Sequence, residues 1–437
     1  MDWEKYLFSL SRFGVKLGLG PTAAFSSMLG DPHKSFKSAH ITGSNGKGST
    51  TSFIYNIFRT KFRSGIYTSP HLRRFNERII VDGEQIPSSY IKEFVEKNPS
   101  RINFHNEVIQ LTFFEYTTVM AFEYFKKMGV QFASIEVGLG GRLDSTNIIL
   151  PEVSVITSIS LEHADRLGGE IEDIAREKGG IIKKNRPVVI GKVPDKAREV
   201  LLHIAKEDGS EVREIEDCTI KNLSFSLNGT RFSLDTGRES YDVFLKALGA
   251  HQVNNSVAAI LAAESTGISP PKEDILRGIS ETRIPGRFEI RRKKPLFILD
   301  GAHNSEAMRV LSDNIKLYSI KDPLVVLGVL KDKNSYNILQ NLSEVSSKIL
   351  ITEPDEPERK KDASMLKKEA SLFFKDIEIK KKPVDAISQA YNSGEDVVVT
   401  GSLYLVGEAE KILDSFEGKG EITSDIYSSN GKELPVE

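Results

Sequence analysis

The sequence predicts an α/β protein of two domains, each built on a sheet with helices on both faces. Short, β-branched apolar runs alternate with longer amphipathic stretches through most of the 437 residues. Uninterrupted apolar strands between helices are typical of parallel sheets that are buried on both faces. The chain also exceeds the size that one hydrophobic core supports, which favours two or three domains.

Composition limits the class of protein and its partners. Apolar residues make up 39% and charged residues 27% of the chain, as in an ordinary soluble globular protein. The net charge of −2 gives no electrostatic reason to expect nucleic acid as a partner. Cys218 is the only cysteine, so no internal disulfide is expected. We see neither a signal peptide nor an apolar run of membrane-spanning length, and we expect a cytoplasmic protein without membrane attachment.

The first predicted domain, residues 1–293, alternates strands with helices and contains one small antiparallel element. Helical spacing of apolar residues predicts helices at 51–59 and 254–266. Between residues 217 and 241 the pattern changes to short alternating pieces around Asn228-Gly229, which predicts antiparallel hairpins. The β-branched runs that predict parallel strands lie at residues 38–42, 65–68, 133–137, 153–159 and 187–190.

A second alternation follows a break at residues 283–287 and a basic run at 291–294. It predicts a smaller, Rossmann-like α/β domain at residues 294–437. About the last twenty residues are rich in Gly, Ser, Asn and charge, and are expected to be weakly ordered. The predicted strands of this domain lie at residues 296–299, 324–330, 348–352 and 396–400.

The most informative motif is the loop His-Ile-Thr-Gly-Ser-Asn-Gly-Lys-Gly-Ser-Thr at residues 40–50. A glycine-rich turn that opens a helix directs backbone N–H groups and the positive end of the helix dipole at one point, which suits phosphate. Lys47 would supply the point charge, and Ser49 or Thr50 a hydroxyl near Mg²⁺. The alternative is a plain βα turn, which would need only the first two glycines, Gly43 and Gly46. The glycine after the lysine also departs from the usual loops of GTPases and kinases. We therefore predict that the first domain is a P-loop, mononucleotide-binding parallel sheet.

Polar residues also follow the other predicted strands, where ligands bind in open α/β sheets. Glu136 closes one strand and is placed to hold Mg²⁺ beside the phosphates, although a local salt bridge is the alternative. His163 follows the next strand, but Mg²⁺ prefers oxygen ligands, and a lone histidine there is more often structural. The loop at residues 68–79 is basic and aromatic, which suits substrate capture as well as an ordinary surface excursion.

Three later positions are less distinctive. Lys178 lies on a predicted helix that ends at a glycine pair, and nothing in its spacing separates it from a solvent-facing lysine. Residues 300–304 leave a strand of the second domain with polar groups that face the first domain. Arg287 follows a Pro-Gly hinge, and is either a linker arginine or a group that stabilises transferring phosphate between the domains.

Together these segments resemble the folylpolyglutamate synthase and dihydrofolate synthase family, within the Mur-type ATP-dependent amide ligases. The departures are small: Ser44 stands where Thr is more frequent, Gly179 where Ala is usual, and Tyr404 where some members have His. The matching blocks keep their order across nearly the whole chain, at residues 13–19, 42–50, 69–79, 111–115, 136–147, 160–168, 177–183, 249–252, 285–289, 300–304 and 400–402.

The resemblance implies roles residue by residue. It makes Ser69, Glu136 and His163 ligands of one Mg²⁺, and it matches Lys178 to a carbamylated lysine that binds a second Mg²⁺. The implied catalytic residues are Lys47, Lys178, Arg287 and His303. The implied ATP-binding residues are Gly43, Ser44, Asn45, Gly46, Lys47, Gly48, Ser49, Asn255, Arg287 and Asp300. The residues matched to the pterin-bearing substrate are Thr112, Phe113, Phe114, Glu115, Leu143, Asp144 and Ser145.

The implied reaction joins a folate-type carboxylate to the amine of L-glutamate through an acyl phosphate, driven by ATP. The sequence shows no exposed hydrophobic seam, so a monomer is the default expectation. The resemblance leaves open whether dihydropteroate, tetrahydrofolates or both are glutamylated. One alternative is a Mur-type peptide ligase of cell-wall precursors. Such ligases typically carry an extra N-terminal domain. Because the phosphate loop begins at residue 43, we expect no such domain here. The others are a P-loop kinase or NTPase, disfavoured by the spacing Lys47-Gly48-Ser49, and a nucleotide sensor without glutamate-dependent turnover.

Overall fold

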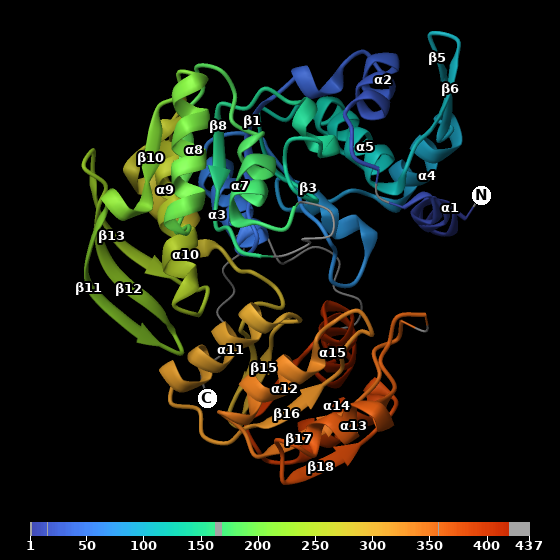
Figure 1. The fold of residues 1–437 in the computed structure, drawn as a ribbon, viewed down its shortest axis with the longest axis vertical. Coiled ribbons are helices and arrows are strands. Elements are labelled where there is room, and N and C mark those ends of the chain that lie inside the picture. The colour runs from blue at the N-terminus through green and yellow to red at the C-terminus, as the bar shows by residue number, and fades with distance from the viewer. Residues whose placement is uncertain (1, 15, 162–167, 357, 419–437) are drawn as a thin grey trace.

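The computed structural model describes residues 2–14, 16–161, 168–356 and 358–418, and contains two α/β domains in contact (Figure 1). The first domain runs from blue to yellow in the figure, and the second from orange to red. Two predictions concern residues outside this part of the chain: the placement of His163 and the order of the C-terminal end. Within the described ranges, no helix is both long and apolar enough to cross a bilayer.

A mixed sheet forms the centre of the first domain. Its strands are β1 (Lys37–Thr42), β2 (Ser64–Tyr67), β3 (Ile79–Val81), β4 (Glu84–Gln85), β7 (Phe132–Glu136), β8 (Val153–Ile156), β9 (Val188–Ile190) and β10 (Val212–Glu214). Their order is β10-β9-β8-β1-β7-β2-β3-β4, parallel from β10 to β2 and antiparallel at β3 and β4. The five parallel strands predicted from the sequence are therefore confirmed. β8 ends three residues before its predicted end, because the following residues turn toward the loop after β1.

Helices cover both faces of this sheet. The helices are α1 (Trp3–Ser9), α2 (Gly20–Met28), α3 (Lys47–Arg59), α4 (Ser88–Lys97), α5 (Phe113–Lys127), α7 (Ile171–Gly179), α8 (Asp195–Glu207), α9 (His251–Ser265) and α10 (Lys272–Glu281). Short 3₁₀ turns lie at η1 (Leu10–Phe13), η2 (Pro32–Lys34), η3 (Phe75–Arg78), η4 (Ser145–Ile148) and η5 (Ile215–Asp217). One face packs against α3, α9 and α10, and the other against α5, α7 and α8.

Strand side chains alternate between these two cores, as the pleat of a strand requires. In β8, Val153 and Val155 pack toward α3 and α9, whereas Ile156 packs toward α7 and α8. In β7, Phe132 faces the first core, whereas Ile135 faces α5. Both faces of each strand are apolar, which explains why these strands read as continuous hydrophobic runs in the sequence.

Antiparallel strands form two additions to the first domain. The added strands are β5 (Arg101–Phe104), β6 (Glu107–Gln110), β11 (Thr219–Ser226), β12 (Gly229–Asp235) and β13 (Ser240–Leu245). The hairpin predicted at Asn228-Gly229 is confirmed: β11 pairs with β12, and Gly229 is the first residue of β12, with φ +141°. Lys293 Nζ donates to Asn228 Oδ1 (3.0 Å), which ties this hairpin to the second domain.

The second domain has a sheet of order β14-β15-β19-β16-β17-β18. Its strands are β14 (Glu289–Lys293), β15 (Leu296–Leu299), β16 (Leu324–Leu327), β17 (Lys348–Ile351), β18 (Asp376–Ile379) and β19 (Val397–Thr400). Its helices are α11 (Ser305–Leu317), α12 (Ser335–Ser343), α13 (Ala363–Ala370), α14 (Pro383–Asn392) and α15 (Leu403–Phe416). β14 is hydrogen-bonded to β15, so this sheet includes residues just before the boundary expected at 293.

The carboxyl ends of the central strands meet at one edge of the first domain. β1 lies between β7 and β8, with Ile41 beside Glu136 and Thr42 beside Ile156. β2 lies on the far side of β7, with Tyr67 beside Ile135. The loops after β1, β2, β7 and β8 therefore emerge together, toward the side of the second domain that carries α11 and α15 (Figure 1).

Candidate functional site

The loop between β1 and α3 packs too closely for side chains at two of its glycines. Gly46 has φ +85°, and a Cβ there would lie 2.5 Å from Asn255 Oδ1. A Cβ at Gly43 would overlap Thr157 Oγ1. α3 begins directly after these glycines, at Lys47. Because no side chain projects from these two glycines, the loop can pack closely here. The N–H groups in the first turn of α3 then point toward the edge of the sheet.

Lys47 is folded over this loop. Its Nζ donates to the carbonyl oxygens of Gly43 (2.6 Å) and Ser44 (3.0 Å). These bonds hold the ammonium beside the first turn of α3, where the N–H groups and the helix dipole also favour an anion. The arrangement can bind phosphate through one point charge and several backbone donors.

The segment after β8 braces the loop, a feature that sequence reasoning missed. Ser44 N donates to Ser158 O (2.9 Å), and Asn45 N donates to Ser158 Oγ (2.9 Å). Thr157 Oγ1 donates to Asn45 O (2.6 Å), and Ser160 N donates to Ser44 Oγ (2.9 Å). The signal available in the sequence was a run of hydroxyl residues directly after an apolar strand.

Gln252 on α9 connects two of the residues matched to ATP binding. Asn255 Nδ2 donates to Gln252 Oε1 (2.9 Å), and Gln252 Nε2 donates to Ser49 Oγ (3.4 Å). The structure thus brings Asn255 against the phosphate loop, although more than 200 residues separate them in the chain. Of the two hydroxyls proposed near Mg²⁺, Ser49 has this partner, whereas buried Thr50 Oγ1 has none among the described residues.

Glu136 lies buried over the first turn of α3. Its carboxylate oxygens lie 3.6 Å from the position of a Cβ at Gly48, and Oε2 accepts a hydrogen bond from Ser69 N (3.0 Å). Burial raises the pKa of Glu136 to about 7, and the charge of Lys47 is the largest effect that opposes the rise. Carboxylate and hydroxyl oxygens in this arrangement are donors that Mg²⁺ accepts. Across the described ranges, which exclude His163, no group of three or more His, Cys, Asp or Glu side chains could hold a metal ion.

Lys178 is buried on α7, with 2% of its surface exposed, unlike the solvent-facing lysine that its spacing suggested. α7 packs against the loop that follows Glu136. Arg142 N donates to Glu177 O (2.7 Å), and a Cβ at Gly141 would lie 2.9 Å from Lys178 O. Lysine is almost never this buried in a soluble protein unless it is paired. Its burial beside this loop distinguishes Lys178 from other helical lysines.

The first segment matched to the pterin-bearing substrate begins α5. Thr112 caps the helix in a reciprocal capping box with Glu115, in which Thr112 N donates to Glu115 Oε2 (2.7 Å). The ring of Phe114 lies against Gly138, where a Cβ would lie 2.5 Å from the ring, and Phe113 stacks on Phe8. The start of α5 is therefore packed against the loop after β7.

The second segment matched to the pterin-bearing substrate, residues 143–145, is held in place by buried Asp144. Asp144 Oδ1 accepts hydrogen bonds from Thr146 N (2.9 Å) and Thr146 Oγ1 (2.5 Å), and caps η4. Burial raises the pKa of Asp144, and the hydrogen bonds from Thr146 oppose the rise. Leu143 and Ser145 flank it in the turn. The Asp144 carboxylate therefore bonds to its own loop in this structure.

The residues predicted in the second domain lie together at the end of β15. Asp300 is buried and accepts two backbone N–H groups at 2.8 Å each. Arg287 packs against Gly301, and His303 Nδ1 donates to Gly301 O (2.8 Å). Burial raises the pKa of Asp300, and the charge of Arg287 opposes the rise. One cation and one buried carboxylate thus face each other beside His303.

The two halves of the predicted site are in contact. Asn45 Nδ2, in the phosphate loop, donates to Glu306 Oε2 in the first turn of α11 (2.8 Å).

His251 begins α9, and sequence reasoning gave it no role. Burial, together with the charge of Arg287, lowers the pKa of His251 to about 4, so its ring is neutral at physiological pH.

The loop after β2, which carries Ser69, also joins the two domains. Leu72 packs against the core formed by α14, α15 and one face of the second sheet. Arg73 Nη1 pairs with Asp414 Oδ2 on α15 (2.6 Å). A Cβ at Gly407 would lie only 2.1 Å from the carbonyl oxygen of Leu72. A glycine in the middle of α15 therefore makes room for the backbone of this loop.

Gly407→Ala is expected to destabilise the protein by about 1–3 kcal/mol, because the new methyl group overlaps the Leu72 carbonyl. Without that contact, alanine in a helix interior would instead stabilise by about 1 kcal/mol. The midpoint of urea unfolding measures the sign. Gly267→Ala is the control, since a Cβ at Gly267 meets no atom within 4 Å. A stabilised Gly407→Ala variant would contradict the proposed contact.

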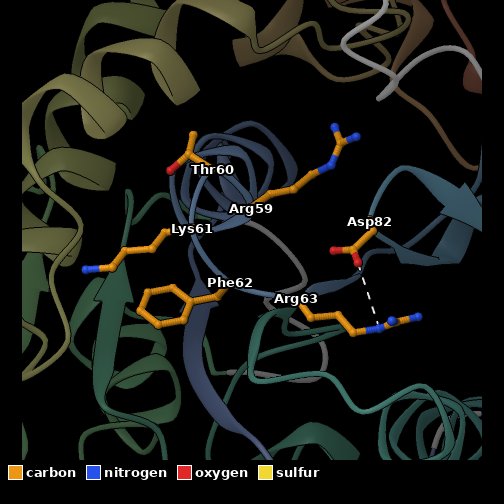
Figure 2. A pocket seen from close by; sticks show the side chains of 6 residues that line it. All are labelled: Arg59, Thr60, Lys61, Phe62, Arg63 and Asp82. Carbon is orange, nitrogen blue, oxygen red and sulfur yellow. Dashed lines mark ion pairs between the residues drawn. The ribbon is translucent and has the colours of Figure 1, made fainter.

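A shallow pocket lies at the opposite end of α3, as Figure 2 shows. α3 has 13 residues, so this pocket is about 20 Å along the helix from the phosphate loop. Arg63 Nε pairs with Asp82 Oδ2 (3.8 Å) across it. Cations at a helix C-terminus complement the helix dipole, so their presence here needs no ligand. The pocket is lined by Arg59, Thr60, Lys61, Phe62, Arg63 and Asp82.

Family comparisons match both domains. The Mur ligase middle domain matches residues 41–263, and the Mur ligase glutamate ligase domain matches residues 286–403. The dihydrofolate synthase/folylpolyglutamate synthase of Bacillus subtilis is 34% identical over 428 residues, which cover 94% of this chain and 98% of that protein. The protein of the same name from Escherichia coli is 30% identical over 436 residues, covering 96% and 97%.

Solved structures show the same arrangement. The folylpolyglutamate synthase of Thermotoga maritima is similar with a TM-score of 0.84 and 34% identity, covering 95% of this chain and 97% of that chain. The Escherichia coli enzyme in complex with DHPP and ADP is similar with a TM-score of 0.84 and 27% identity, covering 95% and 99%. Both similarities extend over both domains.

Proposed function

Because the chain belongs to the folylpolyglutamate synthase/dihydrofolate synthase branch of the Mur ligases, we propose that it joins L-glutamate to a folate-type carboxylate where its two domains meet. It is an ATP-dependent ligase, like the relatives that carry these names. The observation that carries the proposed site is Lys47, folded over a glycine loop at the start of α3. That loop lies beside buried Glu136 and contacts the second domain through Asn45.

The proposed chemistry consists of two substitutions. The substrate carboxylate attacks the γ-phosphoryl group of ATP, and ADP leaves with the electrons of the broken bond, which yields an acyl phosphate. The amine of L-glutamate then attacks the acyl carbon, and the tetrahedral intermediate collapses with loss of phosphate and of one amine proton. Both steps depend on positioning and charge neutralisation, so neither needs a nucleophilic side chain.

Charged groups from the first domain and from the hinge suit the first step. Lys47 and the N–H groups of α3 bind the phosphates, and Arg287 supplies a second positive charge from the hinge between the domains. Asp300 attracts Arg287, and Asn255 packs against Gly46. Asp300 and Asn255, both proposed to bind ATP, therefore also help to position Arg287 and the loop that carries Lys47.

We propose that Ser69, Glu136 and His163 bind one Mg²⁺, and that a carbamylated Lys178 binds a second. The hydrogen bond from Ser69 N to Glu136 Oε2 supports this, since it places two oxygen-bearing residues side by side. A carbamate would replace the ammonium of Lys178 with oxygen donors, which suits a buried position beside the loop after Glu136. Mg²⁺ would neutralise charge on the phosphate oxygens.

The activity is tested by ADP release from the full chain with ATP and either dihydropteroate or tetrahydrofolate. We expect release that depends on L-glutamate, and a product heavier by one glutamate residue in mass spectrometry. L-Aspartate in place of L-glutamate is the control. ADP release that ignores glutamate would contradict the proposal. The relative rates with the two pteridines decide between dihydrofolate synthase and folylpolyglutamate synthase activity.

We expect the second domain to close on the first about the Pro285-Gly286 hinge once ATP and folate are bound, because an acyl phosphate must be kept from water. Small-angle X-ray scattering with and without an ATP analogue and folate measures this. The expected result is a smaller radius of gyration in the ternary complex, at the mass of a monomer. Identical particle dimensions in both states would count against closure.

A further inference from the structure

His40 is a buried histidine on β1 that the proposed reaction does not use. It lies three residues before Gly43 and has no exposed surface. Its Nε2 lies 2.8 Å from Thr146 Oγ1, whereas Nδ1 has no hydrogen-bond partner in the part of the chain that the structure describes. Burial lowers the pKa of His40 to about 3, with a smaller contribution from the charge of Lys183, so the ring is neutral at physiological pH.

The direction of these hydrogen bonds follows from Thr146. Its hydroxyl carries one hydrogen, and Oγ1 lies 2.5 Å from Asp144 Oδ1. Asp144 also accepts from Leu139 N (2.9 Å) and Thr146 N (2.9 Å), so both of its oxygens already act as hydrogen-bond acceptors. Thr146 therefore donates to Asp144, and His40 Nε2 must donate to Thr146. The unpartnered Nδ1 is then the nitrogen without a hydrogen.

This chain of bonds ends on the loop after β7. Through Leu139, the Asp144 carboxylate holds the start of the loop, where Gly138 lies against the ring of Phe114. The loop and the start of α5 thus form one packed unit. The phosphate loop depends less on His40, because β1 is paired on both sides with β7 and β8.

We propose that His40 is a positioning residue for the folate-type substrate. Through Thr146 it fixes the Asp144 carboxylate, and thereby holds the loop at residues 138–145 against Phe114. This inference rests on the proposed function, because it takes that loop and the start of α5 as the segments that contact the pterin-bearing substrate. It assigns His40 an effect on binding of this substrate and none on binding of ATP.

Two pairs of variants test the proposal in the full-length enzyme. His40→Leu and Thr146→Val remove the donor and the hydroxyl, whereas His40→Gln and Thr146→Ser keep an N–H and a hydroxyl at those positions. We expect the first pair to raise the KM for dihydropteroate or tetrahydrofolate about tenfold, as for one lost buried hydrogen bond. The KM for ATP stays unchanged, and the second pair stays close to wild type.

Direct binding and a matched control complete the design. The dissociation constant of the pteridine without ATP, from calorimetry, should rise in parallel with its KM. Ser134→Ala on β7 is the control, because the buried Ser134 Oγ has no hydrogen-bond partner within the described residues. Selective ¹⁵N labelling of histidine should show His40 protonated at Nε2 at neutral pH. If His40→Leu fails to fold, Thr146→Val against Thr146→Ser carries the comparison.

The following outcomes would overturn the inference. Equal increases in the KM for ATP and in the KM for the pteridine would show a general structural role. Equal pteridine KM values for Thr146→Val and Thr146→Ser would show the same. Protonation at Nδ1 would reverse the derived hydrogen bonds. Asp144→Ala separates this inference from the function on which it rests. If that variant weakens pteridine binding and Thr146→Val does not, the inference alone fails, but if Asp144→Ala binds normally, the proposed substrate loop is wrong as well.

Discussion

Lys47→Ala is expected to abolish acyl-phosphate formation and to leave the fold intact. The ammonium lies over the phosphate loop, where it would neutralise the transferring group, and loss of such a charge lowers the rate by at least about 10³-fold. The loop backbone keeps its bonds to Ser158, so it should hold its shape without the lysine. The measurement is transfer of ¹⁸O from the substrate carboxylate to phosphate, which requires the acyl phosphate.

An exposed lysine is the control for this variant. Lys92 lies on the solvent side of α4, and Lys92→Ala should keep wild-type transfer of the label. Thermal unfolding midpoints that agree within error for the wild type and both variants would show that the fold is kept. Label transfer that persists in Lys47→Ala would exclude the proposed role of the ammonium.

Lys178→Ala is expected to lower activity by about 100-fold or more, as loss of a metal-supporting group does, and acetate or formate should partly restore it. Removal of the side chain leaves a small cavity in the buried interior beside the loop after β7, because Lys178 has 2% of its surface exposed. A small carboxylate can enter that space and supply the oxygen atoms of the proposed carbamate. The rate is measured as glutamate-dependent ADP release at increasing acetate concentrations.

A neighbouring lysine provides the comparison. Lys184 is exposed, so Lys184→Ala should keep full activity and should not respond to acetate. With ¹³C-labelled bicarbonate, the wild type should show a carbamate carbon signal that Lys178→Ala lacks. Full activity of Lys178→Ala, or the same carbon signal in both proteins, would refute carbamylation.

The fold followed from the sequence where one physical signal dominated. Buried parallel strands are apolar on both faces, and all five predicted strands of the first sheet are present. β18 was missed because Asp376 and Glu378 alternate with its apolar residues, as expected for an edge strand with one face in solvent. β14 was missed because its basic residues read as a linker, whereas Arg291 pairs with Asp414 and Arg292 packs over Tyr391.

The candidate site was harder to predict from local sequence patterns, because its residues come together only in the folded chain. Glycine spacing identified the phosphate loop, since phosphate binding is local to one turn. The link from Gln252 to Ser49 joins residues about 200 positions apart, and no pattern within either segment indicates it. Lys178 likewise has a helical context identical to that of an exposed lysine, and its burial depends on the loop that packs over α7. Its proposed role came from family resemblance alone.

The loop after β2 has a consequence for how the molecule unfolds. Leu72 belongs to the first domain by chain order, yet it packs with the hydrophobic core of the second. The paired side chains of Arg73 and Asp414 lie beside it. A second domain expressed without this loop would expose apolar surface that is covered in the whole protein. The two domains are therefore expected to melt in a single cooperative transition, and calorimetry of the full chain should show one peak, not two.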